Sequence, residues 1–236
     1  MSRSVLVLAG LDPSGGAGLL ADAETVRAVG ARPLCVATAL TVQTTRAARR
    51  FEAVDPSLVA DSVSALLEEE DVGAVKIGMV GSAKVAWAIS RALAAAEVPV
   101  VVDPVLRASS GAALFEGPPE IYLQLARGQI LTPNLLEAAV LLGAELSQEE
   151  AARALLERGP RAVLVKGGHL PGDPVDLLAT DAGVRRFEGT RLAGTARGTG
   201  CRLSSAMAAS LAQGAQLPEA ITAGRALVRA YLAAPR

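Results

Sequence analysis

The chain has 236 residues, a formal net charge of −1 at pH 7 and a sequence pI of about 6.0. This near-neutral balance and an aromatic content of only 3% argue against a nucleic-acid or anionic membrane partner. The sequence lacks an apolar run of membrane-spanning length and the layout of a signal peptide, so we expect a cytoplasmic protein. The two cysteines, Cys35 and Cys201, lie in different contexts and predict neither a disulfide framework nor a metal site.

Short apolar strands alternate with helical patterns along the chain. We expect strands at residues 5–9, 35–40, 74–77, 98–102, 129–131 and 162–165. Each is followed by a polar or glycine-rich turn and then by a helical pattern, which is typical of a mostly parallel α/β sheet with helices on both faces. Residues 175–179 and 184–188 flank a turn and predict an antiparallel edge hairpin. No linker or repeat interrupts the pattern, so we expect one domain over residues 1–236.

Capping residues mark three helix starts. Asp55 precedes a proline, Ser82 precedes a helical run, and Ser147 is followed by Glu150 in the spacing of a capping box. These signals predict helices that begin at about residues 56, 83 and 148.

Ligands of open parallel sheets bind beyond the carboxyl ends of the strands, so the segments after the strands are the candidate sites. The glycine-rich loop after the first strand permits close approach of the backbone, but its spacing and Pro13 exclude a dinucleotide fingerprint. Gln43 follows the second strand in a small, apolar setting. Its amide offers an acceptor and two donors that suit the edge of an aminopyrimidine, although a lone glutamine is also typical of a structural residue.

Three later strands end in charged or polar residues. Asp103 ends one strand, where a carboxylate can hold Mg²⁺ through water beside a phosphate. Asn134 and Glu137 lie one helical turn apart and can face one site, but helix capping for Asp103 and Asn134 and a surface position for Glu137 are the alternatives. Lys166 precedes two glycines, which suits a point-charge contact to polyphosphate. His169, the only histidine, has no partner visible in the sequence, so its catalytic and structural interpretations both stay open.

Residues 198–201, Gly-Thr-Gly-Cys, open directly into a helical pattern. Such a junction presents free backbone N–H groups and the positive end of the helix dipole to an anion. The glycines allow a phosphate to approach the main chain, and we expect the Cys201 thiol to lose its proton more readily than a free one. The alternative is a helix entry built on small residues.

Together these segments resemble the ribokinase superfamily, and within it the hydroxymethylpyrimidine and phosphomethylpyrimidine kinases with the related bacterial pyridoxal kinases. The resemblance rests on residues 9–18 with 21–22, 38–45, 76–79, 101–105, 131–138, 166–169 and 198–201, in the family's order. It implies a ribokinase-like αβα sandwich and a cytoplasmic homodimer. It also implies ATP- and Mg²⁺-dependent phosphorylation of 4-amino-5-hydroxymethyl-2-methylpyrimidine, and of its monophosphate, in thiamine biosynthesis.

The resemblance also implies roles for single residues. The anion hole for the transferring phosphoryl group would be formed by Gly198, Thr199, Gly200 and Cys201, and Cys201 stands where more distant sugar kinases carry an aspartate base. The pyrimidine site would be lined by Gly10, Asp22, Gln43 and Met79. The ATP phosphates and Mg²⁺ would be served by Asp103, Asn134, Glu137 and Lys166, with Asp103 reaching the metal through water.

Two segments depart from the family pattern. Residues 108–112 read Ala-Ser-Ser-Gly-Ala where the family commonly has Ala-Lys-Ser-Gly-Asp, so Ser109 and Ala112 replace two charges. Residues 196–197 read Ala-Arg instead of Thr-His. Arg107 and Arg197 are candidates to replace the missing lysine at the phosphates. The alternatives to the pyrimidine substrate are pyridoxal or pyridoxine and, in another class, a catalytically weak ligand-binding paralogue.

Overall fold

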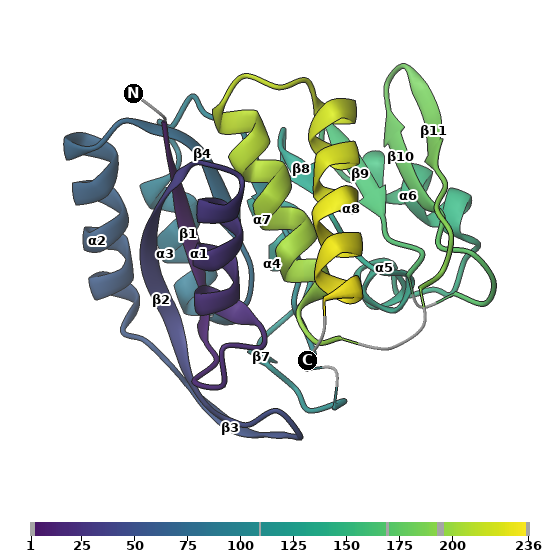
Figure 1. The fold of residues 1–236 in the computed structure, drawn as a ribbon. Helices are drawn as coiled ribbons and strands as arrows, with labels where there is room; N and C mark the ends of the chain where they lie inside the picture. The colour runs from purple at the N-terminus through teal and green to yellow at the C-terminus, as the bar shows by residue number, and fades with distance from the viewer. Residues whose placement is uncertain (1–2, 109, 169, 193–195, 235–236) are drawn as a thin grey trace.

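The computed structural model describes residues 3–108, 110–168, 170–192 and 196–234. Its centre is a nine-stranded sheet between two layers of helices (Figure 1). The strand order is β11-β10-β9-β8-β6-β4-β1-β2-β3. In chain order these strands are β1 Ser4–Leu11, β2 Arg32–Gln43, β3 Ala48–Ala53, β4 Val72–Ile77, β6 Val100–Val102, β8 Ile130–Leu131, β9 Ala162–Val165, β10 Asp176–Thr180 and β11 Gly183–Phe187.

The interior of the sheet is parallel and both of its edges are antiparallel. The run from β9 through β8, β6, β4 and β1 to β2 is parallel, which confirms the expected α/β class. The expected hairpin is formed by β10 and β11, and β10 also pairs antiparallel with β9. The second antiparallel edge, where β3 pairs with β2, was not predicted, because residues 48–53 carry charges on an exposed strand and lack an apolar run.

The helices divide into two layers with separate cores. One layer is formed by α1 Gly18–Ala28, α7 Thr199–Ala212 and α8 Leu217–Ala233, which lie in front of the sheet in Figure 1. The other is formed by α2 Pro56–Glu69, α3 Ala83–Ala92, α4 Ile121–Leu125, α5 Leu135–Leu142 and α6 Gln148–Leu156. Successive side chains of β1 alternate between the layers: Val5 and Val7 pack with α7, and Leu6 and Leu8 pack on the opposite face. Strands buried on both faces therefore require the continuous apolar runs seen in the sequence.

The marked helix starts are confirmed. Asp55 caps α2 through the N–H groups of Ser57 and Leu58, Ser82 caps α3, and Ser147 forms a capping box with Glu150 at the start of α6. These caps fix where three of the helices that cover the sheet begin.

A small apolar cluster lies beside the main sheet, where two short parallel strands, β5 Gly81–Ser82 and β7 Phe115–Glu116, pair with each other. The cluster contains Ala39, Met79 and Leu114. Segments after β4 and after β6 are thereby held against the β2–β3 hairpin.

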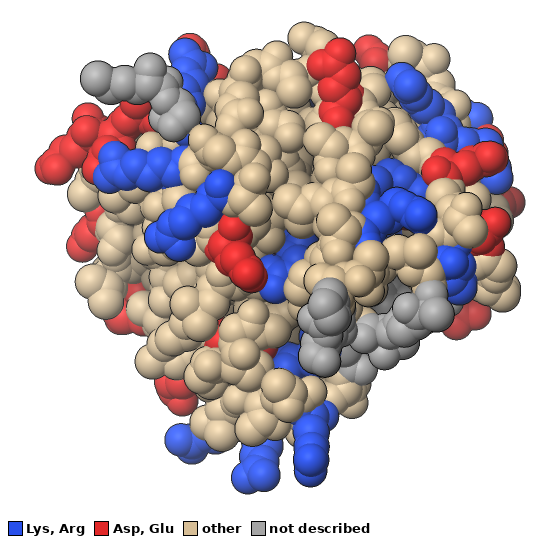
Figure 2. Space-filling view, viewed as in Figure 1, with Lys and Arg blue, Asp and Glu red and all other residues tan. Residues whose placement is uncertain are grey.

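Positive and negative side chains are interspersed over most of the face in Figure 2, and basic side chains gather at its lower end. Figure 1 places the β2–β3 hairpin there, and its exposed arginines are Arg46, Arg49 and Arg50. Among the described residues, no helix has both the length and the apolar composition needed to cross a membrane.

Candidate active site

The predicted site segments meet at one edge of the molecule. The parallel strands end at the lower edge of the sheet in Figure 1, where the loops after them lie near the first turn of α7. This convergence follows from parallel topology, because strands that run in one direction end on the same side.

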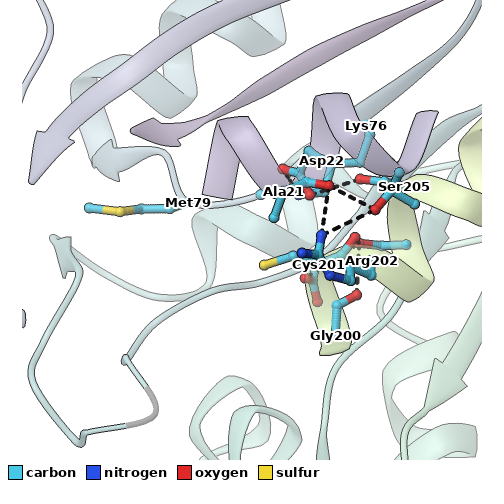
Figure 3. A network of polar contacts seen from close by, with 12 residues as sticks. Ala21, Asp22, Lys76, Met79, Gly200, Cys201, Arg202 and Ser205 are labelled. Atoms are coloured by element: carbon cyan, nitrogen blue, oxygen red, sulfur yellow. Dashed lines mark hydrogen bonds and ion pairs between the residues drawn. The ribbon is translucent and has the colours of Figure 1, made fainter. Parts of the chain in front are cut away.

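A buried ion pair lies beneath the first turns of α7. Lys76, on β4, points toward the α7 layer, and its Nζ lies 2.5 Å from Asp22 Oδ2 of α1. Ser205 of α7 donates to the other Asp22 oxygen at 2.8 Å. Both members of the pair have fully buried side chains, and Figure 3 shows how the lysine, the aspartate and the serine converge from three elements.

Burial opposes both charges of this network and their mutual attraction favours them: burial raises the pKa of Asp22, and Lys76 lowers it only in part. Burial by itself would lower the pKa of the Lys76 ammonium, but the adjacent Asp22 carboxylate raises it above its ordinary value. A methyl group on Gly78 would lie 2.6 Å from Lys76 Nζ, so the chain turns closely around the ammonium group. The network joins β4, α1 and α7 and thereby fixes where α7 begins.

A second lysine, Lys166, lies between the carboxylates of Asp103 and Glu137. Lys166, directly after β9, places Nζ 2.5 Å from Asp103 Oδ1 and 3.8 Å from Glu137 Oε2. The Ser204 hydroxyl of α7 lies 3.4 Å from the other Asp103 oxygen. A methyl group on Gly200 would lie 3.1 Å from Lys166 Nζ, so this lysine stands beside the first turn of α7. We call Asp103, Glu137, Lys166 and Gly200 the Lys166 cluster.

Asn134 caps α5, which was its alternative interpretation, whereas Glu137 completes the capping box and does not take the surface position that was its own alternative. Asn134 Oδ1 accepts from the Glu137 N–H at 2.9 Å, and Glu137 Oε2 accepts from the Asn134 N–H at 2.7 Å. The Asn134 side chain is therefore occupied in starting α5, whereas Glu137 both caps the helix and contacts Lys166. Asp103 caps no helix and belongs to the Lys166 cluster.

Burial changes the proton affinities within this cluster. It raises the pKa of Glu137 to about 7, and Asp103 adds to the rise while Lys166 and the Asn134 amide oppose it. Burial alone would lower the pKa of Lys166, but Asp103 and Glu137 together raise it above its ordinary value. The cluster thus combines a lysine that stays charged with a glutamate that titrates near neutral pH.

The turn before α7 depends on glycine. Gly198 has φ 72°, and a methyl group there would lie 2.3 Å from the Gly16 carbonyl oxygen. Only glycine combines this left-handed conformation with so close a contact. The α7 N-terminus is consequently packed directly against the loop after β1.

The expectation for the Cys201 thiol is wrong. Burial raises its pKa to about 11, although Lys76 and the Gly18 amide act in the opposite direction. Desolvation of the thiolate outweighs the favourable end of the helix dipole. The side chain is half-buried, and in Figure 3 its sulfur points toward the side on which Met79 lies.

Of the four residues expected to line a pyrimidine site, Gly10 and Met79 lie side by side, Gln43 contacts the loop after β1, and Asp22 is buried in an ion pair. Gly10 and Met79 are so close that a methyl group on Gly10 would lie 2.5 Å from the Met79 sulfur. Gln43 ends β2 and contacts Asp12 in the loop after β1. Asp22 is instead sealed in the Lys76 ion pair with no exposed side chain, because its partner comes from the buried face of β4.

The two arginines proposed to replace a family lysine take other partners. Arg107 is exposed and donates to the Gly111 carbonyl at 3.1 Å. Arg197 pairs with Asp12 at 3.1 Å. Neither side chain contacts the Lys166 cluster, since both are held by groups in nearby loops. Ser109 and His169 lie outside the described residues.

Sequence reasoning missed the importance of Lys76, Asp12 and Ser205 as partners. One signal was present for Lys76: a lysine inside an otherwise apolar strand needs a buried anion. Nothing local pointed to Asp22 as that anion, because the two residues are 54 positions apart.

The Lys166 cluster has the donor chemistry that a magnesium–phosphate complex needs. Mg²⁺ is usually held by one or two carboxylates together with substrate phosphates and water. Asp103 and Glu137 supply carboxylate oxygens beside Lys166. Among the described residues no group of three or more His, Cys, Asp or Glu side chains is arranged to hold a metal, so phosphates would have to complete the coordination.

Comparison with known proteins places this chain in a family. The family model described as phosphomethylpyrimidine kinase matches residues 12–235. A thiamine biosynthesis bifunctional protein of Geobacter sulfurreducens is 42% identical over 97% of this chain, and this chain spans 49% of that protein's length. A hydroxymethylpyrimidine/phosphomethylpyrimidine kinase of Rhizobium meliloti is 39% identical over 99% of this chain and 92% of its own length.

Solved structures of kinases have a similar fold. The crystal structure of a phosphomethylpyrimidine kinase from Clostridium difficile has a TM-score of 0.82 at 32% identity, covering 97% of this chain and 99% of that one. An ADP complex of Bacillus subtilis pyridoxal kinase has a TM-score of 0.82 at 26% identity, covering 96% and 90%. The αβα fold expected from the sequence is confirmed by these similarities.

The buried pair yields a test of stability. Lys76→Met leaves the Asp22 carboxylate buried without its cation and should lower the free energy of unfolding by about 3–5 kcal/mol. Adding Asp22→Asn removes the stranded charge and should restore much of that loss. As a control, Arg153→Met removes an exposed pair with Glu149 and should cost less than about 1 kcal/mol. Urea unfolding measures all three; a Lys76→Met protein as stable as the control would contradict the buried-pair assignment.

The raised pKa of Glu137 yields a test by pH. A carboxyl that titrates near 7 when folded and near its ordinary value of 4.5 when unfolded holds its proton longer in the folded state. Its contribution to stability therefore falls as the pH rises from about 4.5 to about 7. Glu137→Gln keeps an acceptor for the Asn134 N–H but cannot titrate. The free energy of unfolding of the wild type, minus that of Glu137→Gln, should thus be greater at pH 5 than at pH 8. Equal differences at the two pH values would show that Glu137 is not buried as described.

Proposed function

This chain belongs to the phosphomethylpyrimidine kinase family, and from that premise we propose that it transfers the γ-phosphoryl group of ATP to a hydroxymethylpyrimidine. The acceptor is the hydroxymethyl group of 4-amino-5-hydroxymethyl-2-methylpyrimidine, and the monophosphate of that alcohol is the second acceptor. The chain is a small-molecule kinase of thiamine biosynthesis, in line with the names of its relatives.

The observation that carries the proposal is the position of Lys166 beside the first turn of α7. Lys166 Nζ lies within 3.1 Å of where a Gly200 side chain would begin, and it is paired with Asp103. The first turn of a helix presents unpaired N–H groups and a partial positive charge. A lysine ammonium and this helix end thus act on the same small volume, which suits a transferring phosphoryl group.

Phosphoryl transfer depends mainly on positioning and on neutralising charge. In the proposal, the N–H groups of residues 199–201 and the Lys166 ammonium hold the γ-phosphate. Gly10, Gln43 and Met79 hold the alcohol, and the Cys201 sulfur points toward the side on which Met79 lies. With its pKa raised to about 11, the Cys201 thiol is protonated at neutral pH in the free protein, so it contacts the reacting groups as a neutral thiol.

Magnesium belongs to the same proposal. Asp103 and Glu137 would hold it together with the ATP phosphates, where it would neutralise charge on the transferring group. The side chain of Asn134 acts there only through the cap that orients Glu137.

Three further features extend the proposal to the whole molecule. We infer one catalytic domain over residues 1–236, supported by a sheet that draws strands from both halves of the chain. We infer a homodimer, supported by the exposed apolar side chains of Leu40 and Val42 on β2. We also propose that catalysis takes place in the cytoplasm, where ATP is available.

A coupled assay of ADP release tests the proposed function. Purified protein is given ATP and Mg²⁺ with the aminopyrimidine alcohol, its monophosphate, pyridoxal or pyridoxine. We expect release with the first two and less with the others. Faster release with pyridoxal would favour the pyridoxal-kinase alternative, which the Bacillus subtilis neighbour supports at the level of a relative. Binding of an alcohol without release of ADP would favour a ligand-binding paralogue.

Gly200 gives the sharpest test of the anion site. Gly200→Val places side-chain atoms against Lys166 and beside the helix N-terminus, and it should lower kcat about a hundredfold or more. The dissociation constant for ATP should change much less, because in the proposal this residue meets only the γ-phosphate. Steady-state kinetics and calorimetry with ATP separate the two effects. Normal turnover by Gly200→Val would remove the site from this position.

A further inference from the structure

The Asp12 carboxylate joins three segments of the chain: the loop after β1, the end of β2 and the segment just before α7. One oxygen accepts from the Ser14 N–H at 2.9 Å and from the Ser14 hydroxyl at 2.7 Å. The other accepts from Gln43 Nε2 and from Arg197 Nη2, each at 3.1 Å. Asp12 is only 3% exposed, so both oxygens are committed to these partners.

Arg197 supplies the cation for this carboxylate. It is the only ion-pair partner of Asp12 among the described residues. Its other terminal nitrogen donates to the Thr44 carbonyl at 2.7 Å and to the Ser14 hydroxyl at 3.3 Å. The guanidinium thus bridges the loop after β1 and the end of β2 from the segment just before α7. An arginine can make these contacts together because its donors form a rigid fork.

The Gln43 amide is thereby oriented. An ionised carboxylate only accepts hydrogen bonds, so the amide must turn its NH₂ group to Asp12 and its carbonyl oxygen away. Gln43 is 8% exposed, yet the described part of the chain neither provides Oε1 with a donor nor encloses it. A buried amide with an open acceptor is suited to a ligand that brings an N–H group.

We propose that Arg197 is a specificity-positioning residue, which through Asp12 holds Gln43 with its carbonyl oxygen toward the ligand and so selects heteroaromatic alcohols that carry an exocyclic amino group. This inference rests on the proposed function and deepens it. Arg197 does not contact the ligand itself. Its contribution is to hold the Asp12 carboxylate in place, because Arg197 donates to the same Asp12 oxygen that accepts from the Gln43 NH₂ group.

Direct binding tests the proposal with a matched pair of ligands. The probes are 4-amino-5-hydroxymethyl-2-methylpyrimidine and the analogue in which a methyl group replaces the amino group. Calorimetry without ATP gives the ratio of their dissociation constants. Wild type should prefer the amino compound about tenfold, the contribution typical of one hydrogen bond. Arg197→Met and Gln43→Leu should each reduce this preference to near unity.

The double variant separates positioning from general support of the fold. If Arg197 acts through Gln43, adding Arg197→Met to Gln43→Leu leaves the ratio unchanged. Arg32→Met is the matched control, because Arg32 makes a two-point pair with Glu70 at the other end of β2 and should not alter the ratio. Thermal unfolding confirms that each variant is folded. Should Arg197→Met fail to fold, Asp12→Asn replaces it, since an asparagine can pair with either end of the Gln43 amide and should also abolish the preference.

Three results would overturn the inference: wild type without a preference, including failure to bind either compound; equal weakening of both compounds by Arg197→Met; or a further change of the ratio in the double variant. Failure of the proposed function looks different. Wild type that prefers the amino compound in binding but releases no ADP with it would contradict the kinase and leave the role of Arg197 supported.

Discussion

The Lys76–Asp22 ion pair is the constraint on which the arrangement of the site depends. Both side chains are fully buried, and the pair spans β4 and α1 while Ser205 ties it to α7. A buried ion pair is expensive to desolvate and is weak evidence for stability. Its placement is more informative, because a displaced α7 would leave the buried Asp22 carboxylate without the hydrogen bond from Ser205. The N-terminal end of α7, which faces the Lys166 cluster, is therefore held in place by its contact with the buried ion pair.

Close backbone contacts also restrict the positions of α1 and α7, here for steric reasons. Gly198 lies against the Gly16 carbonyl, and Gly18 lies equally close to the Gly10 carbonyl, with a methyl group at either position only 2.3 Å from oxygen. Any side chain at these positions would push α7 or α1 away from the loop after β1. The Ser205–Asp22 hydrogen bond thus holds α7 against β4 and α1. The glycine contacts determine how closely the N-terminus of α7 approaches the loop after β1.

Charged residues far apart in the sequence divide the site into two parts. Lys166 and Asp103, 63 positions apart, form the part suited to phosphate. Arg197 and Asp12, 185 positions apart, form the part that orients Gln43. Each positive charge in these parts is engaged by a carboxylate. The cluster around Lys166 can accept a phosphate complex, whereas the Arg197 pair is committed to loop contacts and does not take the place of a phosphate-binding lysine.

The sequence by itself determined the fold class, the order of the strands along the chain and most of the site segments. Apolar runs such as residues 5–9, caps such as Asp55 and the glycine-rich turn at residues 198–201 are local signals, because they reflect burial, hydrogen bonding and backbone freedom of adjacent residues. Tertiary structure alone decided the partners of the charges. It buried Asp22 with Lys76 instead of exposing it to a ligand, raised the pKa of Cys201 to about 11 and gave Arg197 to Asp12. Ion pairing and desolvation depend on distances between residues that the sequence separates widely, so no local pattern could have shown them.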